Sequence, residues 1–263
     1  IAVQTNTDGI HSAYGFLSEN AIFAQKVKDA GIKFIGPSIK AINVMGDKLD
    51  AKQAVKAFDV PMVPGTDEEI TDIAEGKKIA EGIGYPILIK ASAGGGGKGM
   101  RVDENSAEFE SQFDRAVSEA ISSFGNGAVF IEKYVQQPKH IEIQVIADQH
   151  GNVLHLNERE CSIQRRHQKL VEETPSPFID SKLRKKMGNA AIKAAEAIKY
   201  EGVGTVEFLV DKNHDFYFME MNTRIQVEHT ITEEVVNYDL VKEQIKLAAG
   251  DPISGEDYYP QMH

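Results

Sequence analysis

Five long polar side chains recur at every second position near the end of the string FYFMEMNTRIQVEH, residues 216–229. They are two carboxylates, two amides and a guanidinium, from Glu220, Asn222, Arg224, Gln226 and Glu228. In an extended chain these five would line one face, while the intervening, mostly apolar residues would contact a core. A solvated strand face is the alternative, but such a face normally carries Lys, Thr and Ser. The mixture of acids, amides and Arg favours a lined site.

A second apolar run, VGTVEFLV at residues 203–210, contains one carboxylate, Glu207. The turn-rich residues KNHD separate this run from the polar string, so we predict an antiparallel hairpin that brings Glu207 close to Glu220. A carboxylate in a buried strand is costly unless it is paired or bound to a metal. Glu207, Glu220 and Asn222 form an all-oxygen set that suits Mg²⁺ or Mn²⁺ better than Zn²⁺. Structural salt bridges to Arg or Lys are the alternative.

The glycine-rich string YPILIKASAGGGGKGMRV is a second candidate site. It predicts a buried strand at residues 85–91 that ends near Lys90, then four glycines at 94–97 with Lys98, and then another strand. Backbone N–H groups of such a loop can approach a phosphate closely. The string satisfies G-x-G-x-x-G, yet no helix follows, and no Lys-Ser or Lys-Thr pair completes a Walker A loop. We predict a flexible phosphate cover, supported by Lys98 and Arg101; a plain linker is the alternative.

The elements that must position these sites follow from periodicity and breakers. We expect helices up to residue 27 and at 45–58, 70–83, 106–123, 180–198 and 238–249. Strict alternation after Pro138 predicts a strand with His140, Glu142 and Gln144 on one face, and we expect one sheet across residues 128–160. The cation-rich residues 162–175 are a candidate anion site or, alternatively, a solvated loop.

Composition narrows the function classes. The chain has 263 residues, of which 41% are hydrophobic and 26% charged, and this is typical of a globular protein of one to three structural units. A net charge of −11 argues against nucleic acid as the main partner. No apolar run approaches the roughly 18 residues of a membrane span. The single cysteine, Cys161, excludes an internal disulfide and fits a reducing compartment, and we interpret it as structural.

The chain starts at Ile1 rather than at Met, opens directly on site-like residues and stops shortly after a helix, so we expect both ends to be cut from a longer protein. The helix, strand and helix before residue 58 suggest the tail of an α/β layer whose earlier strands are missing. The strand–loop–strand unit and the carboxylate hairpin together predict nucleotide phosphates held between a flexible cover and a metal-binding sheet, which phosphoryl transfer requires.

The chain resembles the ATP-grasp region of biotin carboxylase, as found in acetyl-CoA, propionyl-CoA and pyruvate carboxylases. The matching strings are YGFLSEN, FIGP, MGDK, IKASAGGGGKGMR, EKY, HIEIQV, CSIQRRHQK, EFLV and EMNTRIQVEH, in family order over nearly the whole chain. The resemblance implies an α+β, ATP-grasp fold preceded by the tail of a Rossmann-like α/β domain. It assigns residues 1–36 to that N-terminal domain and 37–263 to the ATP-grasp domain, with a lid subdomain at 62–135 and a truncated catalytic sheet subdomain at 136–263.

The resemblance also implies an activity: a ligase that uses ATP to convert bicarbonate to carboxyphosphate and passes its CO₂ to biotin on a carrier protein or domain. The implied ATP-binding residues are Lys48, Lys90, Gly94, Gly95, Gly96, Gly97, Gly99, Met100, Glu132, Lys133, Val135, His140, Gln164, His167, Glu207 and Glu220. Glu207, Glu220 and Asn222 hold magnesium or manganese. Arg224, Gln226, the backbone of Val227 and Lys169 hold bicarbonate, Glu228 is the general base, and Tyr14 lies near biotin. Arg224 and Lys169 complete the implied catalytic set.

The implied setting is the first half-reaction of an acyl-CoA or pyruvate carboxylase, for example acetyl-CoA carboxylase in fatty acid biosynthesis. It includes a carboxyltransferase partner and a homodimer of the full-length protein, in the cytoplasm or, in a eukaryote, the mitochondrial matrix.

HSAYG and HTITE each lack a proline that the family usually shows, and the chain ends before a further arginine of the biotin site. A carbamoyl-phosphate-type ATP-grasp ligase and a nucleotide-binding fragment without turnover are the alternatives.

Overall fold

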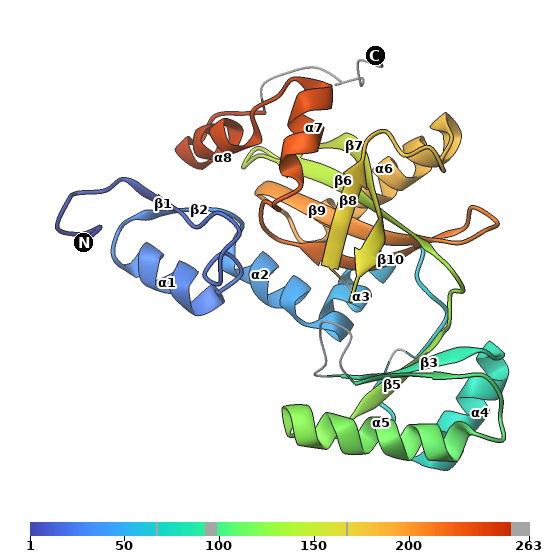
Figure 1. The fold of residues 1–263 in the computed structure, drawn as a ribbon. Coiled ribbons are helices and arrows are strands. Elements are labelled where there is room, and N and C mark those ends of the chain that lie inside the picture. The colour runs from blue at the N-terminus through green and yellow to red at the C-terminus, as the bar shows by residue number, and fades with distance from the viewer. Residues whose placement is uncertain (67, 93–98, 167, 254–263) are drawn as a thin grey trace. The chain divides into compact units, whose positions relative to one another are not determined.

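A computed structural model describes residues 1–66, 68–92, 99–166 and 168–253 (Figure 1). The chain divides into two compact units. The first unit comprises Ile1–Pro61, Pro138–Gln164 and Lys169–His263, and the second comprises Met62–Gln137 and Arg165–Gln168. The domain boundaries predicted above at residues 36 and 135 remain predictions.

A five-stranded sheet forms the centre of the first unit. Its strands, in the order β10-β9-β6-β7-β8, are Phe216–Asn222, Gly202–Val210, Lys139–Ala147, Val153–Arg165 and Gln168–Glu173. β6 is antiparallel to both β7 and β9, and β9 is antiparallel to β10. The predicted hairpin is therefore confirmed, with KNHD in its turn.

The alternation predicted for β6 separates two different faces of this sheet. Ile141 and Ile143 are fully buried, and Glu158, the partner of Ile143 on β7, accepts a hydrogen bond from Arg184 of α6 (Ser181–Ala197) over 2.8 Å. This face is thus covered by α6, which comes very close to the sheet. A Cβ added at Gly188 would lie 2.4 Å from the ring of His155, so a larger residue there would have to displace that ring. The opposite face carries Glu142 and Glu207.

The described residues of the first unit contain seven further elements. The two short parallel strands are β1 (Gly9–His11) and β2 (Lys33–Ile35), and the helices are α1 (Ala21–Asp29), α2 (Ile39–Gly46), α3 (Lys48–Lys56), α7 (His229–Val236) and α8 (Leu240–Ala249). α1 begins after Asn20, whose Oδ1 caps the helix by accepting from Phe23 N over 2.8 Å. Within the described residues, no helix has both the length and the apolar character needed to cross a bilayer.

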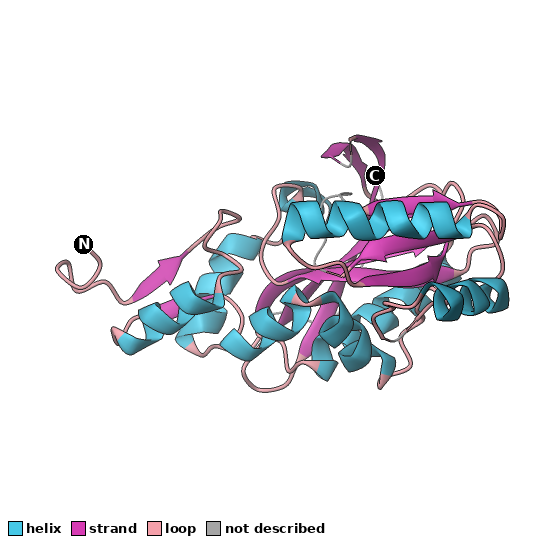
Figure 2. Cartoon of the chain, turned by 90° about the horizontal axis from the view of Figure 1, so that it is seen from below, coloured by secondary structure: helices cyan, strands magenta, loops and turns pink. Residues whose placement is uncertain are grey.

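The second unit packs two helices on a three-stranded antiparallel sheet (Figure 2). The strand order is β4 (Met100–Asp103), β3 (Ile87–Ala91) and β5 (Val129–Lys133), and the helices are α4 (Ile73–Ile83) and α5 (Phe109–Phe124). Its core combines β3 and β5 with Phe109 and Phe113 of α5. β3 is the central strand, so the glycine-rich segment connects two neighbouring strands, as predicted.

Three sequence predictions about elements are wrong. Residues 128–160 do not form one sheet, because β5 pairs with β3 in the second unit while β6 and β7 belong to the first. The helix predicted at 45–58 is interrupted at Asp47, whose Oδ1 caps α3 by accepting from Leu49 N and Asp50 N. The alternative of a solvated loop at 162–175 does not hold either, because residues 162–165 extend β7 and residues 168–173 form β8. The polar strand predicted to continue to Glu228 ends at Asn222, and α7 was not predicted.

Candidate active site

The two carboxylates of the hairpin lie opposite each other. Glu207 of β9 and Glu220 of β10 are partners in the antiparallel register, next to an irregularity between Phe218 and Glu220. Directly opposite residues in such strands share one face of the sheet. Asn222 belongs to the same group, since its Nδ2 donates to Glu207 Oε1 over 2.8 Å. The proximity predicted for these three side chains is confirmed.

Lys169 of β8 lies at the centre of a carboxylate cluster. Its Nζ donates to Glu142, to Glu207 Oε1 over 2.8 Å and to Glu228 Oε1 over 2.8 Å. An ammonium carries three N–H groups, so these contacts use all of them. Burial alone would lower the pKa of Lys169, but the charges of Glu142 and Glu207 hold it above its ordinary value. We call Lys169, Glu142, Glu207 and Glu228 the Lys169 cluster.

Glu207 and Glu228 are held in the ionised form. Burial would raise the pKa of Glu207, but the hydrogen bond from His140 and the charge of Lys169 hold it well below its usual range. Burial also opposes ionisation of Glu228, yet the hydrogen bond and charge of Lys169 lower the pKa of that carboxyl. Glu228 is therefore a carboxylate that can accept a proton rather than an acid that can donate one.

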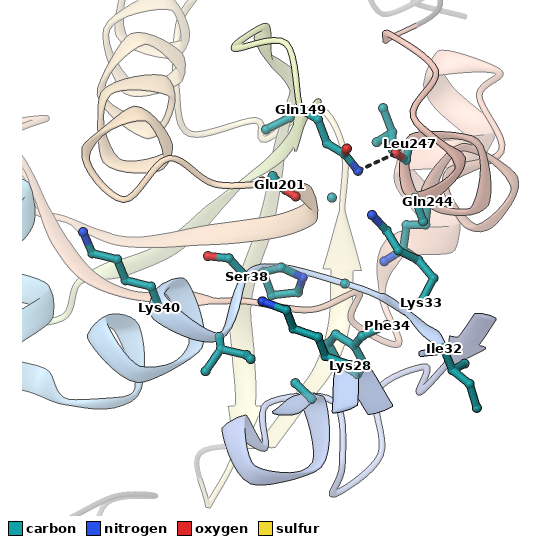
Figure 3. Close-up of a pocket in the computed structure, with 17 residues that line it drawn as sticks. Lys28, Ile32, Lys33, Phe34, Ser38, Lys40, Gln149, Glu201, Gln244 and Leu247 are labelled. Atoms are coloured by element: carbon teal, nitrogen blue, oxygen red, sulfur yellow. Dashed lines mark hydrogen bonds between the residues drawn. The ribbon is translucent and has the colours of Figure 1, made fainter. Parts of the chain in front are cut away.

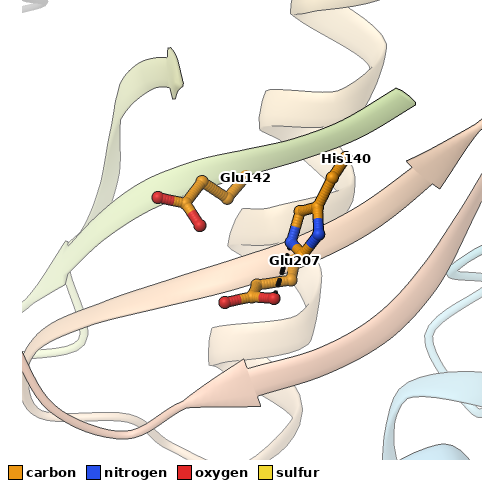
Figure 4. Close-up of side chains that lie close together, drawn as sticks. All are labelled: His140, Glu142 and Glu207. Atoms are coloured by element: carbon orange, nitrogen blue, oxygen red, sulfur yellow. Dashed lines mark hydrogen bonds and ion pairs between the residues drawn. The ribbon is translucent and has the colours of Figure 1, made fainter. Parts of the chain in front are cut away.

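His140 of β6 holds Glu207 from the other side. Gln164 Nε2 donates to His140 Nδ1 over 2.9 Å, so the ring hydrogen lies on Nε2, which donates to Glu207 Oε2 over 2.7 Å. Figure 4 shows this contact and Glu142 beside it. Ligand atoms of His140, Glu142 and Glu207 lie within 4.8 Å of one another, a spacing that could hold a cation. In this structure Lys169 Nζ already bridges Glu142 and Glu207.

Glu220 differs from the Lys169 cluster because the part of the chain that the structure describes gives it no hydrogen bond. Its pKa is raised first by desolvation and then by the charge of Glu207, whereas Lys48 acts in the opposite direction. The side chain remains accessible to solvent. Lys48, the first residue of α3, is therefore close enough to influence Glu220.

Residues 223–228 form a loop between β10 and α7. Gln226 is buried whereas Val227 is 63% exposed, so the predicted core contact of Val227 is wrong. The cause is a turn at the start of α7, where the Gln226 carbonyl accepts from His229 N over 3.2 Å and from His229 Nδ1 over 2.7 Å. The loop still delivers its polar groups to the cluster, because Gln226 Nε2 donates to Glu207 Oε1 over 3.1 Å.

Arg224 is oriented by Glu19, which the sequence did not single out. Glu19 Oε2 accepts from Arg224 Nε over 2.9 Å, and its Oε1 accepts from Thr223 N over 2.8 Å. Arg224 Nη2 also donates to Asn222 Oδ1 over 3.1 Å. Glu19 thus ties the loop after β10 to the segment before α1. Its position beside Asn20, in the string that precedes the helix, was the only available signal.

The second unit positions its own group of predicted residues. Lys90 Nζ donates to Glu132 on the neighbouring strand β5 and lies 5.7 Å from the Phe130 ring. Lys133 Nζ donates to the Gly84 and Tyr85 carbonyls over 2.7 and 2.9 Å.

At the ends of the glycine-rich segment, Gly99 N donates to Glu119 Oε1 over 3.3 Å, and Glu119 Oε2 accepts from Arg101 over 2.6 Å. Arg101 is therefore paired with α5, and the phosphate role suggested for it gains no support. Gly99 has a φ of +69°, which only glycine adopts readily.

Several predicted residues are not joined to these groups. Gly94, Gly95, Gly96, Gly97, Lys98 and His167 lie outside the described residues. Met100 begins β4, and Val135 follows β5. Tyr14 is half exposed in a turn, and within the described ranges it makes no hydrogen bond to another predicted site residue. Cys161 is buried, which raises the pKa of its thiol and fits a structural role.

A cavity of about 450 Å³ lies away from this site (Figure 3). Its lining comes mainly from residues 32–40, with further residues from α1 and α8, and contains none of the predicted site residues. Three exposed lysines, Lys28, Lys33 and Lys40, line it, and Gln149 Nε2 donates to the Leu247 carbonyl at one side over 3.2 Å. The Lys169 cluster rather than this cavity is the candidate active site.

Comparison with known proteins shows which family this chain resembles. A family model described as "Carbamoyl-phosphate synthase L chain, ATP binding domain" matches residues 47–255, and one described as "Biotin carboxylase, N-terminal domain" matches residues 1–42. A biotin carboxylase of Nostoc sp. is 55% identical over 95% of this chain and 56% of its own length. Human mitochondrial pyruvate carboxylase is 51% identical over 95% of this chain and 21% of its own.

A solved structure supports the same grouping. The biotin carboxylase domain dimer of Hydrogenobacter thermophilus 2-oxoglutarate carboxylase, solved with MgADP, ADP and bicarbonate, matches with a TM-score of 0.88 and 49% identity over 97% of this chain and 56% of that one. The carboxylate-bearing sheet and the strand–loop–strand unit define an ATP-grasp fold. The chain belongs to the biotin carboxylase family. It spans about half the length of the biotin carboxylase relatives that it matches.

Proposed function

We propose that this chain belongs to an enzyme that carboxylates biotin on a carrier protein, with ATP and bicarbonate as substrates. The observation that carries the proposal is the Lys169 cluster: an ionised Glu228 held by Lys169, with Gln226 and Arg224 on the adjoining loop. An anion with one removable proton needs both cationic or N–H donors and a carboxylate base, and bicarbonate is such an anion.

We assign the first chemical step to this group. Arg224, Lys169, Gln226 and the Val227 backbone hold bicarbonate, whose hydroxyl proton passes to a Glu228 oxygen as a bicarbonate oxygen attacks the γ-phosphorus. The bond from that phosphorus to the ADP oxygen breaks, which leaves carboxyphosphate and ADP. The carboxyphosphate C–O bond then breaks, and the carboxyl carbon bonds to the biotin ureido nitrogen. The nitrogen loses its proton, for which the departing phosphate is the strongest nearby base.

The residues present fit a divalent cation. Glu207 and Glu220 face each other in register, and Glu220 keeps a raised pKa because desolvation and the charge of Glu207 disfavour its ionised form. Glu207, Glu220 and the Asn222 amide would hold Mg²⁺ or Mn²⁺, which suits oxygen ligands. When bound, the cation neutralises charge on the triphosphate.

We also propose a set of ATP-binding residues. It comprises Lys48, Lys90, Gly99, Met100, Glu132, Lys133, Val135, His140, Gln164 and His167, together with the glycines at 94–97. The lid subdomain at 62–135 and the N-terminal domain tail at 1–36 are part of the same proposal. Tyr14 is proposed to lie near biotin.

We also propose the larger setting, which relatives suggest by their names. The partners are a biotin carboxyl carrier and a carboxyltransferase, and the full-length enzyme is a homodimer, as in the structure from Hydrogenobacter thermophilus. The final acceptor is an acyl-CoA or a keto acid, in acetyl-CoA carboxylase for fatty acid synthesis or in a pyruvate carboxylase. The proposed location is the cytoplasm or, in a eukaryote, the mitochondrial matrix.

Oxygen tracing tests the proposed first step. The full-length protein with ATP, Mg²⁺ and ¹⁸O-labelled bicarbonate should place one labelled oxygen in each phosphate released, since bicarbonate oxygen forms the new bond to phosphorus. Phosphate that carries only solvent oxygen would contradict it.

A carbamoyl-phosphate-type ligase is the second candidate, favoured by the family description that matches residues 47–255. Ammonia-dependent turnover without biotin would identify that activity.

Glu220→Gln should separate metal binding from stability. The pKa of Glu220 is raised in the folded protein, which means that folding disfavours its ionised form. The ionised side chain therefore lowers the free energy of unfolding at pH values above its usual pKa of about 4.3. We expect the variant to unfold at the same temperature or higher at pH 7.5 without metal, with the difference disappearing as the pH falls below about 4. The Mg²⁺ concentration for half-maximal ATP turnover should rise about tenfold or more. Unchanged Mg²⁺ dependence would remove the metal assignment.

Glu19→Gln should loosen Arg224 without touching the nucleotide residues. The glutamine retains an acceptor for Thr223 N but loses the charge opposite Arg224 Nε. Because this ion pair is partly exposed, we expect only a several-fold rise in bicarbonate KM and little change in ATP KM. Steady-state kinetics of the full-length protein measures both. An ATP KM that rises as much as the bicarbonate KM would place Glu19 in a different role.

A further inference from the structure

Arg159 of β7 is a guanidinium with no exposed surface at all. Its relative exposure is 0%, and it is the largest fully buried side chain among the described residues. All five of its N–H groups have an acceptor. Nε donates to Glu142 Oε1 over 2.5 Å, Nη1 to Gln144 Oε1 over 2.6 Å and Thr232 Oγ1 over 2.9 Å, and Nη2 to Thr205 Oγ1 over 3.1 Å and Gln226 Oε1 over 3.3 Å.

These acceptors come from four separate parts of the first unit. Glu142 and Gln144 belong to β6, Thr205 to β9, Thr232 to α7, and Gln226 to the loop after β10. The planar fork of a guanidinium fixes the directions of all five bonds at once. Arg159 therefore determines how the loop at 223–228 and the start of α7 lie on the sheet.

Two of the five bonds lead to the Lys169 cluster, one directly to Glu142 and one through Gln226 to Glu207. Glu142 gives one oxygen to Arg159 and the other to Lys169, so its carboxylate plane is fixed by both cations. The Gln226 amide is oriented in the same way: its oxygen accepts from Arg159, and its nitrogen donates to Glu207. A flipped amide would turn its NH2 group toward Arg159 and its oxygen toward the Glu207 carboxylate, so the two contacts together fix the orientation.

We propose that Arg159 is a positioning residue that sets the Gln226 amide and the Glu142 carboxylate for bicarbonate binding. The inference rests on the proposed function and adds to it a residue that touches no substrate. A buried ion pair by itself contributes little net stability, because desolvation offsets the attraction. The geometric task explains why a charged group occupies this part of the interior.

Arg159→Lys in the full-length protein tests the proposal, because it keeps the charge beside Glu142 but cannot supply five fixed donors. We expect bicarbonate KM to rise about tenfold to a hundredfold while ATP KM stays within about threefold. Backbone amides of residues 223–228 should exchange with deuterium faster. Thr232→Val is the matched control: it removes one Arg159 acceptor on α7, should lower the melting temperature, and should leave bicarbonate KM within about threefold.

A double-mutant cycle decides whether Arg159 acts through Gln226. In a Gln226→Ala background, Arg159→Lys should add less than about threefold to bicarbonate KM. If Arg159→Lys does not fold, Arg159→Met combined with Glu142→Gln removes both charges, and it should raise bicarbonate KM relative to Glu142→Gln alone.

The proposal is overturned if Thr232→Val shifts bicarbonate KM as far as Arg159→Lys, or if the Arg159→Lys effect is the same with and without Gln226. A parent protein without bicarbonate-dependent turnover overturns the proposed function instead. In that case the exchange of residues 223–228 alone decides for or against positioning by Arg159.

Discussion

Glu228→Gln is expected to lower bicarbonate-dependent turnover by about 10²–10⁴, the usual contribution of a positioned general base. Glutamine keeps the shape of the side chain and can still accept the hydrogen bond from Lys169, but it cannot take up a proton. In the parent protein the carboxylate is ionised because Lys169 lowers its pKa. ATP affinity should change little, because Glu228 belongs to the bicarbonate side of the proposed site.

Glu234→Gln is the matched control for this experiment. It removes the same charge six residues further on, from an exposed position of α7. Its turnover should equal that of the parent. If Glu228→Gln turned over bicarbonate within a few-fold of the parent while ATP binding fell, Glu228 would be a nucleotide or metal residue rather than the base.

Lys169→Met is expected to have the largest combined effect on activity and stability. Methionine fills a similar volume but leaves Glu142, Glu207 and Glu228 without the cation that they share. Removing one partner of a buried charge group costs about 3–5 kcal/mol of unfolding free energy. Turnover should fall by at least about 10², because the anion site and the base lose the same contact.

The loss of stability in Lys169→Met should depend on pH. In the parent, the pKa values of Glu207 and Glu228 are lowered, so their stabilising effect is present above about pH 4.3 and is lost as the pH falls through their folded values. In the variant, these carboxylates repel one another. The difference in unfolding free energy between parent and variant should therefore be largest near pH 7 and shrink below about pH 5.

Chemical unfolding of both proteins between pH 4 and 8 measures this dependence. Lys242→Met, at an exposed position of α8, controls for the loss of a lysine. A stability difference that stays constant down to pH 4 would mean that Lys169 does not compensate the carboxylates. A control variant that is destabilised equally would show that the effect is not specific to the cluster.

Alternation and a turn signal were sufficient to predict the carboxylate hairpin. Glu207 stood alone in an apolar run, and the KNHD turn fixed the register that sets it opposite Glu220. The same rule failed after Asn222, because alternation holds only while the chain stays extended. The turn that starts α7 depends on His229 and Gln226 contacts that periodicity does not encode.

Long-range pairing explains the other differences. The strand at 129–133 has an apolar pattern that fits any sheet, and only its partner β3, about 40 residues earlier in the chain, assigns it to the second unit. Arg159 sits in the string NERE, which resembles a solvated segment, although all its N–H groups have buried acceptors. A charged residue whose hydrogen-bond acceptors come from four distant parts of the chain gives no local signal.

The most direct test of the proposed function is the transfer of radiolabelled bicarbonate to biotin by the full-length protein. The account predicts label on biotin only when ATP and Mg²⁺ are both present, one ADP formed for each carboxyl transferred, and loss of that transfer in Glu228→Gln but not in Glu234→Gln. ATP turnover that needs ammonia and proceeds equally without biotin, with no label on biotin, would contradict it.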